Sequence, residues 1–99
     1  MITITSLDVN GLIFTGMQIV LPETNLFIIA NERGYIMNAS FRVQFANQLE
    51  HERLIAATTS TVHSIDDLFH AHLEEVTTAA SKFGWRVGMR GKDALLTIT

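Results

Sequence analysis

Apolar and polar residues alternate at the N-terminal end of the chain. Apolar and polar side chains largely alternate over Ile2–Asp8, as on a strand with one buried face. The dipeptide Asn10-Gly11 follows and favours a type I′ hairpin turn, because that turn needs positive φ at both positions. A second strand is predicted over Leu12–Leu21. It ends at Pro22, which has no N–H to offer a strand ladder.

Two more strands are predicted before the pattern changes. Leu26–Ala30 is a continuous apolar run, which is typical of a central strand. Asn31–Gly34 has the composition of a turn, and Tyr35–Ala39 then returns. The chain is therefore expected to begin with four antiparallel strands.

A helical period replaces the alternation after these strands. Phe41, Phe45 and Leu49 recur every four residues, which predicts an amphipathic helix to about Arg53. Leu54–Val62 is rich in β-branched residues and predicts another strand.

The C-terminal third holds the clearest helix signals. Ser64 is a good N-cap, and two aspartates follow in the first turn, where carboxylates complement the helix dipole. The apolar set then continues in two groups, and Gly84 follows it as a C′ glycine would. These apolar positions are Ile65, Leu68, Phe69, Leu73, Val76, Ala80 and Phe83. They predict one helix after Ser64 and a second helix over residues 73–83.

The last residues predict two short strands around a tight connection. Trp85–Val87 alternates, Gly88–Gly91 is a turn, and Ala94–Ile98 is a closing strand entered through one helical turn. Strands first, then mixed helices and strands, favour an α+β class. We expect one domain over residues 1–99, a two-layer sandwich in which two to three helices pack on one face of a mostly antiparallel sheet.

Composition adds an expectation about assembly. Of 99 residues, 47% are hydrophobic and only 17% are charged, which is a large apolar share for a chain this small to hide alone. We therefore expect a homo-oligomer. There are no cysteines, and the N-terminus lacks the basic and apolar segments of a signal peptide. The longest strictly apolar run, Leu26–Ala30, is far shorter than a membrane span, so a soluble, cytoplasmic protein is expected.

Charge is unevenly placed along the chain. Residues 82–99 carry four basic residues and one acidic residue, whereas residues 1–81 carry three basic and nine acidic residues. The acidic body argues against general nucleic-acid binding. The basic segment suggests a site for a small anionic ligand, with N–H groups and cationic side chains around the turn. Its residues are Arg86, Gly88, Arg90, Gly91 and Lys92. The alternative is a turn whose glycines supply positive φ beside solvated cations.

Other candidate sites are weaker. Asn31, Gly34 and Tyr35 could form a ligand-binding loop, or a hairpin turn with a half-buried tyrosine. His70, His72 and Glu74 suggest a metal site, but positions i and i+2 diverge on a helix, so no metal or other cofactor is expected.

Two functions follow from these candidates. The first is a non-catalytic module that binds a small anion. The alternative is an enzyme with an active site at a subunit interface, formed by Tyr35, Asn38 and Arg90. No nucleophile–base pair is visible, so the enzyme ranks second.

Four segments carry a resemblance to a known family. They span almost the full chain and are Leu21-Pro22-x-Thr24-Asn25-Leu26, Ala30-Asn31-x-x-Gly34-Tyr35-Ile36-Met37, Thr61-Val62-x-Ser64-Ile65-Asp66-Asp67-Leu68 and Gly88-Met89-x-Gly91-x-x-Ala94-Leu95-Leu96. Together they resemble the YunC-like family of small bacterial and archaeal proteins, a domain of unknown function. The resemblance implies a compact two-layer α+β fold and supplies no established activity.

One position departs from the family pattern. Members of the family often follow the Gly-Tyr-x-Met segment with Cys-Gly, whereas this chain has Asn38 and Ala39. If that cysteine were a nucleophile in relatives, this chain could not share the chemistry, because an amide is not a nucleophile. The reading we favour is a packed strand end, where cysteine acts as a small apolar residue.

Overall fold

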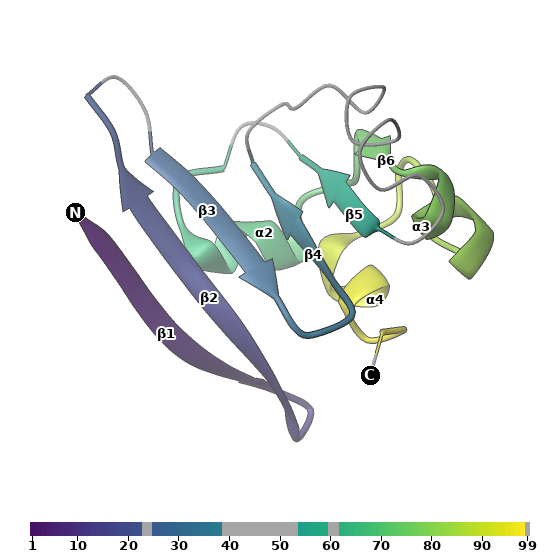
Figure 1. Cartoon of the computed structure of the whole chain (residues 1–99), viewed down its shortest axis with the longest axis horizontal. Helices are drawn as coiled ribbons and strands as arrows, with labels where there is room; N and C mark the ends of the chain where they lie inside the picture. The colour runs from purple at the N-terminus through teal and green to yellow at the C-terminus, as the bar shows by residue number, and fades with distance from the viewer. Residues whose placement is uncertain (23–24, 39–53, 60–61, 99) are drawn as a thin grey trace.

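A six-stranded sheet forms the body of the protein (Figure 1). The computed structural model describes residues 1–22, 25–38, 54–59 and 62–98. Its strands, adjacent in the order β1-β2-β3-β4-β5-β6, are β1 (Ile2–Val9), β2 (Leu12–Val20), β3 (Asn25–Ala30), β4 (Gly34–Met37), β5 (Ile55–Thr58) and β6 (Glu75–Val76). Its helices are α2 (Ile65–His70), α3 (Thr78–Phe83) and α4 (Gly91–Leu95). The predicted α+β class, with a mostly antiparallel sheet, is confirmed.

The first four strands form an antiparallel meander, as predicted. Asn10 and Gly11 connect β1 to β2 with φ values of 55° and 85°, the positive pair of a type I′ turn. β2 ends at Val20, just before Pro22. The predicted turn over Asn31–Gly34 joins β3 to β4.

β5 is the exception in this sheet because it pairs parallel to β4. Gly34 is needed at that junction, since a Cβ there would overlap the carbonyl oxygen of Ile55. A parallel pair requires a crossover connection. The helix predicted from Phe41 to Arg53 falls in this connection and lies outside the described residues.

The hydrophobic core lies between one face of the sheet and helices α2 and α4, which lie behind the sheet in Figure 1. α3 packs against β5 at the far end of the sheet and adds Ala80 to the core. The largest core side chain, Trp85, is fully buried and donates its Nε1–H to Thr97 Oγ1 at 2.8 Å. Of the helices in the described residues, none is long and apolar enough to span a membrane.

Two predicted helix ends are confirmed by their caps. Ser64 is the N-cap of α2, and its hydroxyl accepts the Asp67 N–H at 3.2 Å. Gly84 ends α3 in the left-handed region with φ 115°. Each cap satisfies backbone groups that a helix end would otherwise leave unpaired.

The long helix predicted over residues 73–83 is wrong in its first half. Glu74 N–H and Thr77 N–H bond to carbonyls of β5, so this stretch adds strand β6 to the sheet. Thr77 then caps a shorter α3, because its hydroxyl accepts the Ala80 N–H. Sheet pairing therefore overrides the helical period.

The predictions of two C-terminal strands, Trp85–Val87 and Ala94–Ile98, are also wrong. Residues 85–87 form no strand: Trp85 N–H bonds back to the end of α3, and Met89 N–H closes a turn on Arg86. Ala94 belongs to α4, and a further helical turn continues to the Ile98 N–H, which bonds to Leu95 O. The apolar residues here fill the core from a helix instead of from a closing strand.

Candidate functional site

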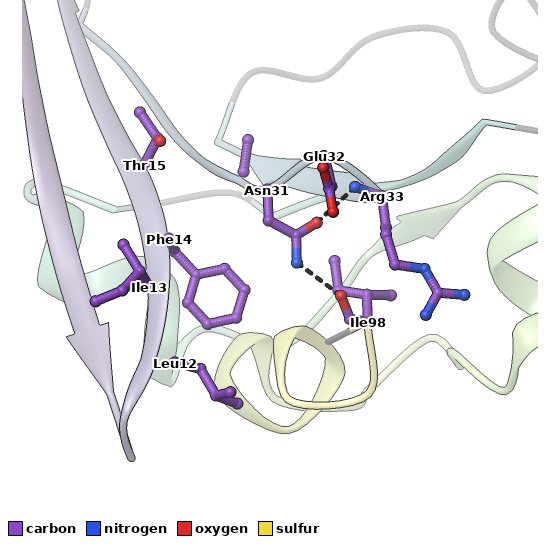
Figure 2. Close-up of a pocket in the computed structure, with 9 residues that line it drawn as sticks. Leu12, Ile13, Phe14, Thr15, Asn31, Glu32, Arg33 and Ile98 are labelled. Atoms are coloured by element: carbon purple, nitrogen blue, oxygen red, sulfur yellow. Dashed lines mark hydrogen bonds between the residues drawn. The ribbon is translucent and has the colours of Figure 1, made fainter.

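An open cleft of about 380 Å³ lies between one end of β2 and the turn after β3 (Figure 2). It exists because the β1–β2 hairpin is longer than its neighbour: β3 pairs with β2 only as far as Thr15. Phe14 and Leu12 point into the gap toward Ile98, and their side chains form its apolar wall. We call this space the β2 cleft; its lining is Leu12, Ile13, Phe14, Thr15, Ala30, Asn31, Glu32, Arg33 and Ile98.

The backbone of Ile13 provides the polar wall of the β2 cleft. The turn bonds Leu12 to Val9, and hydrogen-bonded and non-bonded pairs alternate along an antiparallel ladder. Ile13 stands opposite Asp8 in a non-bonded pair, so its N–H and C=O point away from β1. Because β3 stops pairing at Thr15, these two groups face the cleft.

Asn31 fixes the opposite wall. Its Oδ1 accepts the N–H groups of Arg33 at 2.8 Å and Gly34 at 3.1 Å, which closes the turn. Its Nδ2 donates to the carbonyl oxygen of Ile98 at 2.6 Å and ties the C-terminal turn to β3. The Oδ1 atom and one N–H of Nδ2 are therefore used in structural bonds that fix Asn31 in the cleft wall.

Arg33 brings a positive charge to the same cleft. Its guanidinium carbon lies 5.1 Å from the centre of the Phe83 ring, within the range of a cation–π contact. That contact places the guanidinium next to α3. A guanidinium binds carboxylates through its planar set of N–H donors, and Arg33 is the cationic side chain among the residues that line the cleft.

Sequence reasoning found Asn31 but missed Arg33, Ile13 and Ile98. One signal was present: the predicted strand Leu12–Leu21 is about twice as long as Leu26–Ala30, so part of it had to lack a neighbour. The position of Ile98 in the cleft wall could not be predicted from the sequence, because it depends on α4 returning the chain to β3.

The predicted glycine turn does not present a row of free N–H groups. Gly88 N–H bonds to Leu73 O and Gly91 N–H bonds to Ala71 O, each at 2.8–2.9 Å. Gly91 is buried, and a Cβ there would overlap the carbonyl oxygen of Leu68. Gly88 does have the positive φ, 95°, expected of a turn glycine. What remains for an anion is the set of exposed cationic side chains Arg86, Arg90 and Lys92.

Lys92 stands in acidic surroundings. It lines a second, smaller cleft of about 220 Å³ together with Asp8 and Asp66. Asp66 Oδ2 lies 3.7 Å from His70 Nε2 in the same cleft. An anion at Lys92 would therefore meet two carboxylates, which weakens this part of the predicted site.

The residues of the enzyme alternative do not converge. Ile36 packs under α4, near Gly91, so its neighbour Tyr35 points to the opposite face of the sheet. Arg90 begins α4 on the helix side. Burial raises the pKa of Tyr35, so its hydroxyl stays protonated at neutral pH and is a poor general base. Nothing in this arrangement favours the enzyme.

Asn38 has a structural role at the end of β4. Its Oδ1 accepts the Phe27 N–H at 2.8 Å, and its Nδ2 donates to Asn25 O at 3.0 Å. Its own N–H bonds to Phe27 O at 3.2 Å. The side chain thus extends the β3–β4 ladder beyond the last residue of the strand.

The histidines of the metal hypothesis are separated by the end of α2. His70 is in the last turn of the helix, whereas His72 forms an isolated bridge with Arg90. In the described residues, no three His, Asp or Glu side chains are grouped closely enough to hold a metal ion.

Comparison with known proteins gives a consistent result. Residues 39–98 match the model of DUF1805, a domain of unknown function. The chain is 40% identical over 97 residues to the uncharacterized protein YunC of Bacillus subtilis, covering 97% of this chain and 96% of that protein. The crystal structure of TA1206, a protein of unknown function from Thermoplasma acidophilum, matches with a TM-score of 0.88 at 22% identity. That match covers 100% of this chain and 94% of the other.

Proposed function

The chain belongs to the DUF1805 family of YunC-like proteins, and we propose that it is a non-catalytic module that binds a small carboxylate in the β2 cleft. One observation carries the proposal: Arg33 and the outward peptide group of Ile13 both line this cleft, together with an apolar wall. A small molecule with a carboxylate, an amide and an apolar body matches all three features.

The proposal includes assembly and location. Large apolar side chains stay exposed on β1 and β2, with exposed fractions of 61% for Ile2, 64% for Ile4 and 63% for Ile13. Such a surface supports a homo-oligomer. The chain has no cysteine, as is common in a reducing compartment, and this supports a cytoplasmic location.

The ligand proposal is tested with a matched pair of probes and a matched pair of variants. N-acetyl-leucine carries the carboxylate, and N-acetyl-leucinamide is its neutral counterpart. We expect calorimetric titration to show that the acid binds more tightly than the amide. Arg33→Ala should weaken binding of the acid about tenfold or more, because a charge-assisted contact is lost. Arg90→Ala, which removes an exposed arginine outside the β2 cleft, should change it less than about twofold.

The same titration separates the two anion sites. The Gly88–Gly91 turn with Arg86, Arg90 and Lys92 stays a prediction. Phosphate is the second probe, since it needs no amide partner. If Arg90→Ala weakens phosphate or acid binding and Arg33→Ala does not, the site belongs to the basic turn. If neither probe binds the wild-type protein, the β2 cleft is not a carboxylate site.

A further inference from the structure

The two edges of the sheet are built very differently. β6 closes one edge with only two residues, Glu75–Val76. β1 forms the other edge with eight residues, Ile2–Val9, and lies at the outside of the sheet in Figure 1. A long edge strand is a template for pairing with another chain unless the protein protects it.

β1 carries few of the usual protections. Proteins protect such edges with proline, with charged residues or with bulges. Residues 2–7, Ile-Thr-Ile-Thr-Ser-Leu, contain neither proline nor a charged side chain. β1 pairs with β2 in unbroken register from Ile2 to Val9, so it contains no bulge. Residues 2–6 are all exposed, so none of the described elements covers this part of the edge.

Along β1, alternate residues bond to β2, and this alternation shows which backbone N–H and C=O groups the edge offers to a partner. Met1 O accepts the Val20 N–H at 2.9 Å, and the hairpin turn bonds Val9 to Leu12. Odd-numbered residues therefore bond to β2, and the N–H and C=O groups of even-numbered residues point outward. The outward set is Ile2, Ile4, Ser6 and Asp8.

The side chains of that outward set continue an apolar surface. Ile2 and Ile4 stand opposite Ile19 and Met17 of β2 on the sheet face away from α2 and α4. We call these four residues the isoleucine stripe. A partner that paired with the edge of β1 and presented a second apolar stripe would extend this surface and cover part of it.

We propose that β1 pairs antiparallel with β1 of a second copy of this chain, across a two-fold axis at Ile4, so that the two sheets become one. This inference rests on the oligomer part of the proposed function and is independent of the ligand. A second copy fits because it supplies the same uncharged edge and the same stripe, which makes the contact self-complementary.

The position of the axis follows from the outward groups. With the axis at Ile4, the two Ile4 residues exchange both of their outward bonds, and Ile2 of each copy bonds with Ser6 of the other. All three uncharged outward residues are then used. Asp8 of each copy falls outside the paired region, so the two carboxylates do not face each other. The two Ile4 side chains form a cross-strand apolar pair at the axis, and the two isoleucine stripes then lie on the same face of the joined sheet.

Single-cysteine crosslinking tests the pairing, because the wild-type chain contains no cysteine. In the proposed pair the two Ile4 Cα atoms are about 5.5 Å apart, within the span of a disulfide. Ile4→Cys should therefore form a covalent dimer rapidly under mild oxidation. Val87→Cys is the matched control, since Val87 is 65% exposed but lies in the turn between α3 and α4, away from β1.

Two further measurements make the outcome decisive. Ile4→Lys places two ammonium groups at the axis, and light scattering should show that it has half the mass of the wild-type assembly or less. Faster dimerisation of Thr3→Cys or Thr5→Cys than of Ile4→Cys would keep the β1 pair but move the axis, which overturns the stated register.

The outcomes also separate this inference from the oligomer proposal. If the wild-type protein is multimeric but Ile4→Cys crosslinks no faster than Val87→Cys and Ile4→Lys stays multimeric, the subunits meet elsewhere and β1 pairing is excluded. If the wild-type protein is monomeric at tens of micromolar, assembly itself is wrong.

Discussion

Asn38 shows how much one residue does where strand pairing ends. Its side chain accepts the Phe27 N–H and donates to Asn25 O, so it replaces ladder bonds that the backbone of β4 does not make. Asn38→Ala should lower the free energy of unfolding by about 2 kcal/mol, about 1 kcal/mol for each lost bond. Urea unfolding followed by circular dichroism measures the change.

Asn38→Asp is the matched control because it keeps the acceptor and loses only the donor, so we expect about half the loss. Asn38→Cys keeps neither bond. A midpoint for Asn38→Ala equal to that of the wild type would show that the two bonds contribute nothing net.

Single residues were predicted from the sequence where their partners are close in the chain. Ser64, Gly84 and the Asn10-Gly11 turn have partners within a few positions, and their predicted roles are confirmed. The Asn31 amide instead reaches Ile98, 67 positions away. Turn composition identifies such an asparagine but not its distant partner, and therefore not the cleft between them.

At the scale of the element, the two glycines of the turn that leads into α4 have different roles. Gly91 lets α4 approach α2, because a Cβ would overlap Leu68 O and press on Ile36. Gly91→Ala should therefore cost about 3 kcal/mol of folding free energy. Gly88→Ala should cost about 1 kcal/mol, since open space surrounds Gly88 and only its positive φ is strained.

Equal unfolding midpoints for the two alanine variants would contradict this account of the α4–α2 contact. The comparison also concerns function, because an anion-binding turn would lose affinity at both positions. Phosphate titration of Gly88→Ala, the variant expected to fold, therefore reports on the predicted basic site separately from stability.

Element type was predictable where the pattern was long and failed where it was short. The first two strands were predicted over seven and ten residues, and both strands are confirmed. Residues 94–98 are a five-residue segment that is apolar except for Thr97, which suits a strand as well as a buried helical turn. The core decided between them, since α4 buries Ala94 and Leu95 against the sheet. In the same way, pairing with β5 changed the start of the predicted second helix into β6.

At the scale of the whole molecule, pattern and composition predicted the layers but not their edges. The order of β1 to β4 follows from short connections, which place consecutive strands side by side. The β2 cleft and the open edge of β1 follow instead from differences in strand length and from where pairing stops. Those differences depend on boundaries, which apolar periodicity defines only to within a few residues.

Assembly through β1 predicts a thermal stability that depends on protein concentration. Association stabilises only the folded chain, so the midpoint should rise by about 5 °C across a roughly hundredfold range of concentration for a dimer of this size. Ile4→Lys should show a midpoint that does not change with concentration, because it no longer associates. The variant should still fold, because the Ile4 side chain is exposed and its substitution leaves the core intact. Differential scanning calorimetry of both proteins measures the two slopes. A wild-type midpoint that does not change with concentration would show that the protein is a monomer and that the isoleucine stripe has no partner copy. Equal concentration dependence of the two proteins would show that the subunits meet at another surface.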